Sequence, residues 1–283
     1  MLLFAILSQI LVAAAAIAIP TSRERRAQRL ARRAAGAHSS QPKQVSHDPA
    51  AVHEGTNITA AEYTDNWAGA VYLFWPGIMK SVTGTFVVPV PREPVGADGF
   101  HSVVAWVGID GYHCPDAILQ TGVKMSVSGN DTAYNAWYEW FPFFGHDFDG
   151  FPVRGGDTIT ATVVATSTTS GSATVINHST GQQVTQTFKG YPELCLQEAE
   201  WIVEDYKLNG ERVPLADFDR VTFTNASAET TLVGAVYPGD GTVLDMRQGE
   251  IILAVAEVDG STVNVRYGLG IFGDNPANST ATP

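Results

Sequence analysis

Short strand-like runs alternate with turn residues along most of this chain, and this alternation limits the fold more than any other feature. Runs rich in Val, Thr, Tyr, Phe and Trp are separated by clusters of Gly, Pro, Asp and Asn. Such a pattern predicts strands. They are expected near 66–75, 81–88, 101–109, 117–125, 132–141, 157–166, 171–177, 183–189, 197–205, 219–225, 229–236, 249–258 and 261–268. Regular spacing without a helical period favours one antiparallel β-sandwich or barrel.

Two stretches of this pattern have a more specific interpretation. The Asp259-Gly260 pair between two apolar runs predicts a tight hairpin. Residues 196–206 are the one part of the body whose pattern also fits a helix.

The first 62 residues differ from the rest in composition. Residues 1–20 are apolar and end in a small-residue stretch before Pro20, which is typical of a secretory signal peptide. Residues 21–62 hold 7 of the 17 basic residues and few large apolar ones, so they cannot build a core. A disordered linker is one interpretation; we favour a removable basic prosegment, with the catalytic domain at 63–283.

The body of the chain is acidic. From residue 63 onward, 10 basic residues face 25 acidic ones, which gives a formal charge of −15. This charge excludes a nucleic-acid-binding body. No later stretch reaches 18 apolar residues, so we expect no membrane association after the signal is removed. We also expect the protein to be secreted and to be a monomer.

The cysteines and sequons agree with a secreted protein. Cys114 and Cys195 are the only two cysteines, and an even pair in a secreted chain predicts one disulfide. Five candidate N-glycosylation sites follow the Asn-X-Ser/Thr pattern, namely Asn57, Asn130, Asn177, Asn225 and Asn278.

Common catalytic signatures are missing from the sequence. It has no Gly-X-Ser-X-Gly elbow, no His-Glu-X-X-His helix, no phosphate-binding loop and no Asp-Thr-Gly or Asp-Ser-Gly. The body histidines lack ligand spacing, so we expect no metal site and no cofactor.

Acids and amides among aromatic residues remain as candidates for chemistry. Gln120 follows Ala-Ile-Leu, where a half-buried strand would place an amide that needs partners. Glu139 stands between two tryptophans, and Glu204 ends an alternating run that begins at Glu200. A buried carboxylate is costly unless it is paired or wet. A solvated sheet face with an acid at every second position explains the same pattern.

Four motifs in this region resemble one family in order and spacing. They are Trp-Val-Gly-Ile-Asp-Gly (106–111), Ala-Ile-Leu-Gln-Thr-Gly (117–122), Ala-Trp-Tyr-Glu-Trp (136–140) and Ala-Glu-Trp-Ile-Val-Glu-Asp-Tyr (199–206). Together with Asn66-Trp67 they resemble the fungal glutamic peptidases, the eqolisin or G1 family, over roughly 64–268.

The resemblance implies roles for individual residues. The catalytic pair would be Gln120 and Glu204, and a family disulfide would join Cys114 to Cys195. Trp106, Asp110, Trp137 and Glu139 match positions that line the family's substrate cleft. The implied fold is an all-β antiparallel sandwich of two large bent sheets, a concanavalin-like or lectin-like jelly roll.

The family also implies an activity. We expect an acid endopeptidase, insensitive to pepstatin, that acts on protein and peptide substrates without a covalent intermediate. Glu204 would activate water as general base and then act as acid, while Gln120 stabilises the oxyanion. The basic prosegment is expected to inhibit its own acidic cleft while the carboxylates are ionised.

Two positions depart from the family pattern, and one alternative function stays open. Lys124 and Asn135 stand where a family member carries aspartates, so subsite preference and pH profile are not carried over. A carbohydrate-active enzyme or lectin on the same jelly roll would also use acids and aromatics on a concave face. Such a site gives no role to Gln120.

Overall fold

The computed structural model describes residues 38–46 and 61–271, and side chains to residue 268. Over these residues the chain is all-β, with one short 3-10 turn, η1, at Pro238–Asp240. The strands are β1 (His38–Ser39), β2 (Glu62–Thr64), β3 (Trp67–Leu73), β4 (Met79–Val87), β5 (His101–Ile109), β6 (Ile118–Ser128), β7 (Asp131–Phe141), β8 (His146–Asp147), β9 (Thr158–Ser167), β10 (Ser170–Asn177), β11 (Gln182–Lys189), β12 (Glu198–Glu204), β13 (Lys207–Leu208), β14 (Glu211–Arg212), β15 (Arg220–Thr230), β16 (Gly234–Val236), β17 (Thr242–Gln248), β18 (Ile251–Asp259) and β19 (Thr262–Ile271).

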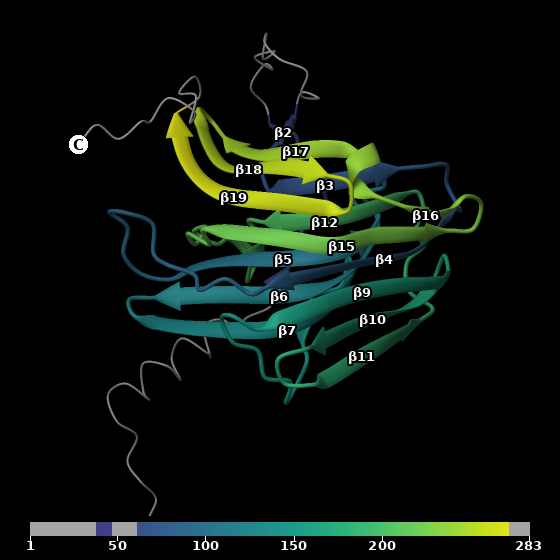
Figure 1. Cartoon of the computed structure of the whole chain (residues 1–283), viewed down its shortest axis with the longest axis horizontal. Coiled ribbons are helices and arrows are strands. Elements are labelled where there is room, and N and C mark those ends of the chain that lie inside the picture. Colours follow the sequence, from purple (N-terminus) through teal and green to yellow (C-terminus); the bar gives the residue numbers. More distant parts are fainter. Residues whose placement is uncertain (1–37, 47–60, 272–283) are drawn as a thin grey trace, which may run out of the picture.

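The strands form two layers that are joined through β15 (Figure 1). One layer has the order β11-β10-β9-β4-β15, and the other runs β19-β18-β17-β3-β12-β5-β6-β7-β8. The first part of β15 pairs with β19 and the second part pairs with β4. The register shifts between Thr224 and Ser227, where Asn225 has a φ of 50°. This bulge lets one strand serve both layers. The predicted sandwich is confirmed.

The main core lies between the two layers. Alternate residues of β5 and β12, such as Val107 and Val203, face the strands β4 and β9. Trp201 is fully buried among them, and its indole Nε1 donates to the Thr83 carbonyl at 2.8 Å. Burial of each large apolar side chain stabilises the fold by about 1.5–3 kcal/mol, so the layers hold together without a covalent link between them.

The structure corrects the strand prediction in two places. Residues 219–236 are not two equal strands, because β15 runs on through the bulge to Thr230 and only β16 remains beyond it. Strand β17 was missed because Asp245, Arg247 and Gln248 make it look like a loop, although Asp245 accepts the Ala256 amide at 2.8 Å. Residues 198–204 form a strand and not a helix, and the hairpin at Asp259-Gly260 is confirmed.

The second face of the larger layer carries the residues of interest. The antiparallel register decides which residues of this face are neighbours across β12, β5, β6 and β7. Ile202 pairs with Trp106, Trp106 with Gly122, and Gly122 with Trp137. A second apolar cluster covers this face and includes Trp67, Trp106, Trp137, Ile202 and Tyr206. Because side chains alternate along strands, this face is separate from the main core.

Candidate active site

The two expected catalytic residues lie on the same face of the larger layer. Gln120 on β6 is the direct cross-strand neighbour of Glu139 on β7. Glu204 ends β12 and pairs with Val104 on β5. Trp106, also on β5, lies between these two parts of the face. All four polar or aromatic side chains are almost completely buried.

Glu204 is held by two donors in a site without solvent. The indole Nε1 of Trp106 donates to its Oε2 at 2.9 Å, and the backbone amide of Gln41 donates to its Oε1 at 2.8 Å. Burial raises the pKa of Glu204 to about 8, although the Gln41 amide and Trp106 each lower it. The carboxyl group therefore binds a proton near neutral pH while this arrangement holds.

Both polar atoms of the Gln120 side chain have unmet hydrogen bonds. Neither its Nε2 nor its Oε1 has a partner among the described residues, although the side chain is fully buried. A buried amide without partners costs about 1–3 kcal/mol for each unmet group. The Gln120 amide, with its hydrogen bonds unmet, is suited to binding a molecule that is not part of the folded chain.

Glu139 adds a second carboxylate beside Glu204. Its Oε2 accepts the backbone amide of Ser40 at 3.1 Å, and its Oε1 has no partner among the described residues. Burial raises the pKa of Glu139 well above its usual value, and the nearby Glu204 raises it further. The consecutive amides of Ser40 and Gln41 thus bond to the two carboxylates.

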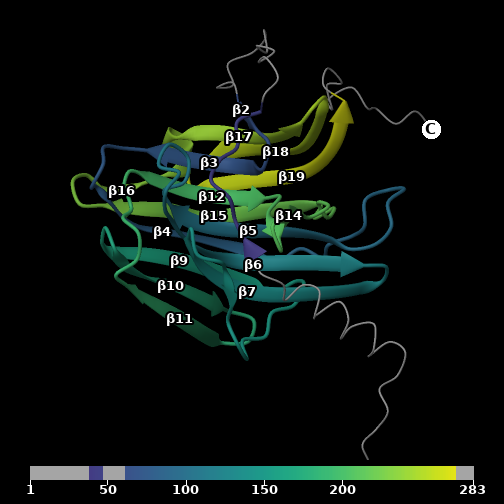
Figure 2. The same cartoon turned by 180° about the vertical axis from the view of Figure 1, so that it is seen from behind.

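Residues 38–46 lie across this face as an extended segment, which we call the cleft segment. In Figure 2 its short strand β1 lies over the region of β5 and β6. β1 pairs with β13, and the His38 carbonyl accepts the Gly145 amide at 2.8 Å. The sequence placed this stretch within the prosegment at 21–62 but carried no signal for its position, because it lacks apolar periodicity.

Asn66 holds the middle of the cleft segment. Its Nδ2 lies 3.2 Å from the carbonyls of both Gln41 and Pro42, and its Oδ1 accepts the Gln44 amide at 2.8 Å. Arg212 on β14 donates to the Gln44 side chain at 2.6 Å. Asn66 thus holds the backbone of the segment, and Arg212 holds the Gln44 side chain.

Lys43 anchors the segment at the edge of the face. Its ammonium lies 2.9 Å from the Glu62 carboxylate and 3.5 Å above the ring of Tyr112. The Tyr112 hydroxyl donates to the same Glu62. Lys43 is the one basic residue of the cleft segment, and the predicted arginine cluster at 23–33 lies outside the described residues.

The other expected cleft residues differ in whether their side chains contact the cleft segment. Trp137 touches the segment, because its ring lies 4.4 Å from the His38 ring, centroid to centroid. Trp106 meets Trp67 edge to face at 5.1 Å. The Asp110 carboxylate does not bind the segment, although the carbonyl of the next residue, Gly111, accepts the Lys43 amide at 2.9 Å. The two carboxylate oxygens accept the amides of Leu196 at 2.8 Å and Gln197 at 3.0 Å.

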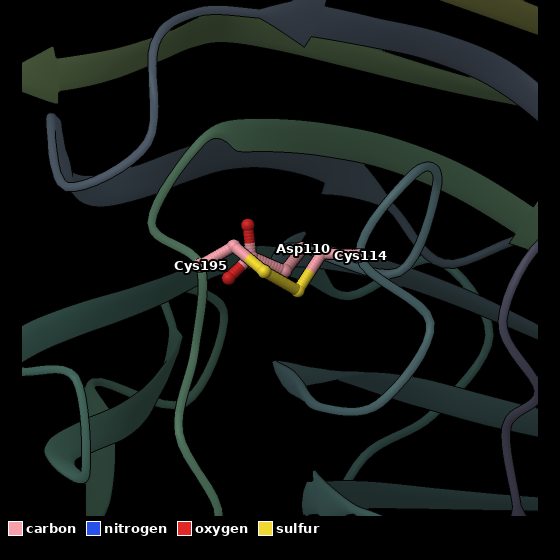
Figure 3. A group of neighbouring side chains, drawn as sticks. All are labelled: Asp110, Cys114 and Cys195. Carbon is pink, nitrogen blue, oxygen red and sulfur yellow. A yellow bond between two sulfur atoms is a disulfide. The ribbon is translucent and has the colours of Figure 1, made fainter.

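Asp110 instead braces the disulfide (Figure 3). Cys114 and Cys195 are bonded, as predicted, with their Cα atoms 6.2 Å apart. Asp110 and the two sulfurs are close enough to suggest a metal site. Because both sulfurs are used in the disulfide, this group is structural. Burial raises the pKa of Asp110 to about 7, against the effect of the two amides that bind it.

The two departures from the family pattern lie next to each other. Lys124 pairs with Asn135 across β6 and β7, and its side chain is 1% exposed. Its ammonium is 3.1 Å from the Asp147 carboxylate on β8. Burial lowers the pKa of Lys124, while Asp147 opposes this shift.

The candidate glycosylation sites differ in accessibility. Asn130 and Asn225 are exposed, whereas Asn177 is buried and its amide nitrogen donates to Pro152 and Asp157. Asn57 and Asn278 lie outside the described residues. Glycosylation at all five stays a prediction.

The chain was compared with known proteins. Residues 65–267 match the Peptidase A4 family. The chain is 44% identical to aspergillopepsin-2 of Aspergillus niger over 93% of its own length and 98% of the relative's. It is 36% identical to scytalidopepsin B of Scytalidium lignicola over 93% and 97%, respectively.

Solved structures agree with this assignment. A scytalido-glutamic peptidase bound to a transition state analog inhibitor has a TM-score of 0.65 and 37% identity, and the match covers 72% of this chain and 98% of that one. The aspergilloglutamic peptidase of Aspergillus niger has a TM-score of 0.57 and 48% identity over 59% and 99%. The chain belongs to the peptidase A4 family, the glutamic peptidases or eqolisins.

Proposed function

We propose that the chain is a secreted endopeptidase that works at acid pH through Glu204 and Gln120. One observation carries the proposal. An extended stretch of polypeptide, the cleft segment, lies over the carboxylates of Glu139 and Glu204, and its backbone amides hydrogen-bond to them. The face is therefore shaped for a peptide backbone. Family membership favours this function over the carbohydrate-active alternative.

Glu204 would provide general base and general acid catalysis. Its ionised carboxylate takes a proton from water as the water oxygen bonds to the scissile carbonyl carbon, and the carbonyl oxygen becomes an oxyanion. When the C–N bond breaks, Glu204 returns the proton to the amine. The indole of Trp106 favours the ionised form that the first step needs.

Gln120 would stabilise the oxyanion. Its amide Nε2 is buried and has no partner among the described residues, so it is available to donate to the developing charge. An amide keeps its N–H at every pH, whereas a carboxyl partner would change its charge under acid conditions. No covalent intermediate is required.

The pKa of Glu204 is consistent with an inactive full-length chain. The value of about 8 arises from burial while the cleft segment is bound. Removal of the segment would let solvent reach the carboxyl and lower its pKa, so that it ionises at more acid pH. A covered, protonated Glu204 cannot accept a proton from water.

The cleft segment would inhibit the enzyme as part of a removable prosegment. Its amides occupy both carboxylates, and it excludes substrate from the same face. In the described residues this hold relies on backbone hydrogen bonds more than on charge. The contribution of the arginines stays a prediction, as do the signal peptide at 1–20, the domain limits and the monomeric state.

The catalytic assignment is tested with purified variants. Haemoglobin digestion at acid pH, with pepstatin present, should be abolished in Glu204→Gln and reduced by roughly 10²–10³ in Gln120→Ala. Glu257→Gln is the matched control, because Glu257 is exposed and distant from this face. Near-normal digestion by Glu204→Gln would overturn the assignment.

The inhibitory role is tested separately. A peptide of residues 21–62 added to processed enzyme should inhibit it near neutral pH, and the Gln41→Pro peptide, which lacks the amide that reaches Glu204, should inhibit less. Absence of inhibition by the unmodified peptide at low salt would count against this part of the proposal.

A further inference from the structure

His38 is enclosed in a pocket that takes a single side chain of the cleft segment. The residue is 1% exposed, and its ring meets Trp137 at 4.4 Å and Tyr206 at 4.7 Å, both edge to face. Gly145 closes one side, since a Cβ added there would lie 2.3 Å from the His38 Nδ1. Only a close fit leaves this little space.

The imidazole has no hydrogen bond in this pocket. Neither Nδ1 nor Nε2 has a partner among the described residues, and the nearest carboxylate oxygen, Oε2 of Glu139, is 3.7 Å from Nδ1. A neutral imidazole can be buried here, and its unmet hydrogen-bonding groups cost free energy. An imidazolium would be a buried cation with two unpaired donors.

The charged groups around His38 do not favour a cation. On β6, Lys124 places a positive charge nearby, and its Asp147 partner on β8 is already paired with it. On β13, which pairs with β1, the titratable residue is Lys207. The next strand, β14, carries Arg212 and the exposed Glu211.

Two acids face His38 from β7 and β12, and their raised pKa values leave them protonated and uncharged at low pH. The Oε2 of Glu139 accepts the Ser40 amide, and burial and Glu204 raise the pKa of Glu139. Glu204 itself is bound by Gln41 and Trp106. Burial, and then the charge of Lys124, lower the pKa of His38 well below 6.5.

These groups respond to acid in opposite directions. Glu139 and Glu204 have raised pKa values under the segment, so their contribution to its binding is present at low pH and is lost as pH rises. His38 has a lowered pKa, so its contribution is present above about 6.5 and is lost as pH falls. Of these three groups, only His38 makes acidification release the segment.

We propose that His38 is an acid-sensitive plug, whose protonation weakens the binding of residues 38–46 in the cleft and opposes the acid-strengthened hold of Glu139 and Glu204. This device rests on the proposed inhibition of the site by the cleft segment. It assigns acid release to one imidazole rather than to neutralisation of the cleft carboxylates.

The test measures release without requiring activity. We would use the full chain carrying Gln120→Ala, which retains both carboxylates that bind the segment. Hydrogen exchange of the Ser40 and Gln41 amides, expressed as protection factors, reports binding of the segment between about pH 7 and pH 4. Because Glu139 and Glu204 strengthen binding in acid, the contribution of His38 is the ratio of protection in this chain to protection in its His38→Phe derivative. This ratio should fall by up to tenfold for each pH unit below about 6.5.

Variants at position 38 distinguish the plug from a simple contact. His38→Phe retains an aromatic ring but cannot be protonated, so its protection should hold or rise as pH falls, because Glu139 and Glu204 strengthen binding in acid. His38→Lys carries a fixed charge and should reduce protection already at neutral pH. His178→Phe, at an exposed histidine elsewhere, should behave like the parent chain.

Two results would overturn the proposal. One is a ratio of parent to His38→Phe protection that does not change with pH, and the other is a ratio that rises as pH falls. If His38→Phe is unprotected even at neutral pH, NMR titration of His38 in the parent decides, and a pKa at or above 6.5 refutes the plug. Self-cleavage, seen as a lower intact mass, would refute the role of Gln120 instead.

Discussion

At the scale of single residues, Trp106 connects the proposed catalytic carboxylate, Glu204, to the sheet. Its indole donates to Glu204, and its ring occupies space that two neighbouring glycines leave free. A Cβ on Gly108 would lie 2.8 Å from the ring, and one on Gly122 would lie 2.0 Å from the Ala105 carbonyl oxygen. The Gly of the Gln-Thr-Gly motif is therefore required by close packing.

Replacement of Trp106 by Phe tests this connection. The change removes the donor to Glu204, so the ionised carboxylate is less stable and its pKa rises. A hydrogen bond to a charged group contributes about 1.5–3 kcal/mol, so the acid limb of the kcat/KM profile should move up by roughly one pH unit or more. Processed enzyme assayed across acid pH gives the measurement, and an unmoved acid limb would contradict it.

Accessibility of individual asparagines makes a second residue-scale prediction. We expect glycan at Asn130 and Asn225, which are exposed, and none at Asn177, whose amide nitrogen is buried and already donates twice. Peptide mapping of the secreted protein before and after enzymatic deglycosylation measures the occupancy. Glycan at Asn177 would show that modification precedes folding of this loop.

At the scale of elements, the disulfide ties together the two segments that carry the proposed catalytic pair. Cys114 lies between β5 and β6, which bears Gln120, and Cys195 lies just before β12, which bears Glu204. Asp110 binds the backbone directly after Cys195. The covalent link and the carboxylate therefore support the same junction.

Removal of the disulfide should lower stability strongly. The bond spans 81 residues, and the chain-entropy model gives about 4 kcal/mol for a loop of this size. Urea unfolding of Cys114→Ala/Cys195→Ala, compared with the parent, measures the loss. A change below about 1 kcal/mol would mean that Asp110 and the surrounding core hold this junction unaided.

At the scale of the whole molecule, buried acids determine how stability depends on pH. The chain has a formal charge of −12, and Glu200 is fully buried with no hydrogen bond to either oxygen among the described residues. Burial, Glu198 and Asp110 raise its pKa well above the usual value. A raised pKa contributes stability at low pH that is lost as pH rises.

The fold should therefore be more stable in acid than in weak base. Ionisation of one such group weakens folding by up to about 1.4 kcal/mol per pH unit above the usual pKa. Glu200→Gln should match the parent in Tm near about pH 4 and exceed it near about pH 8, because the amide stays neutral. The exposed Glu257→Gln serves as control, and equal Tm values at the higher pH would refute the assignment.

The sequence by itself determined the fold class and led to the proposed site residues. Alternating strand patterns and turn residues are local signals, so β5, β6, β7 and β12 were predicted close to their observed bounds. Gln120, Glu204 and the cysteine pair were found through motifs whose order and spacing resemble one family. The bulge at Asn225 misled the prediction, because a left-handed residue in a strand resembles a turn.

Only the tertiary structure decided which groups meet across the active face. Glu139 and Glu204 lie on strands far apart in the sequence and come together through sheet register and the cleft segment. Asp110 shared a motif with Trp106, but its positive φ turns it toward the disulfide. The environment of His38 arises from β6, β7, β8 and Tyr206 together, and burial and charge at such a site depend on long-range contacts that no local pattern encodes.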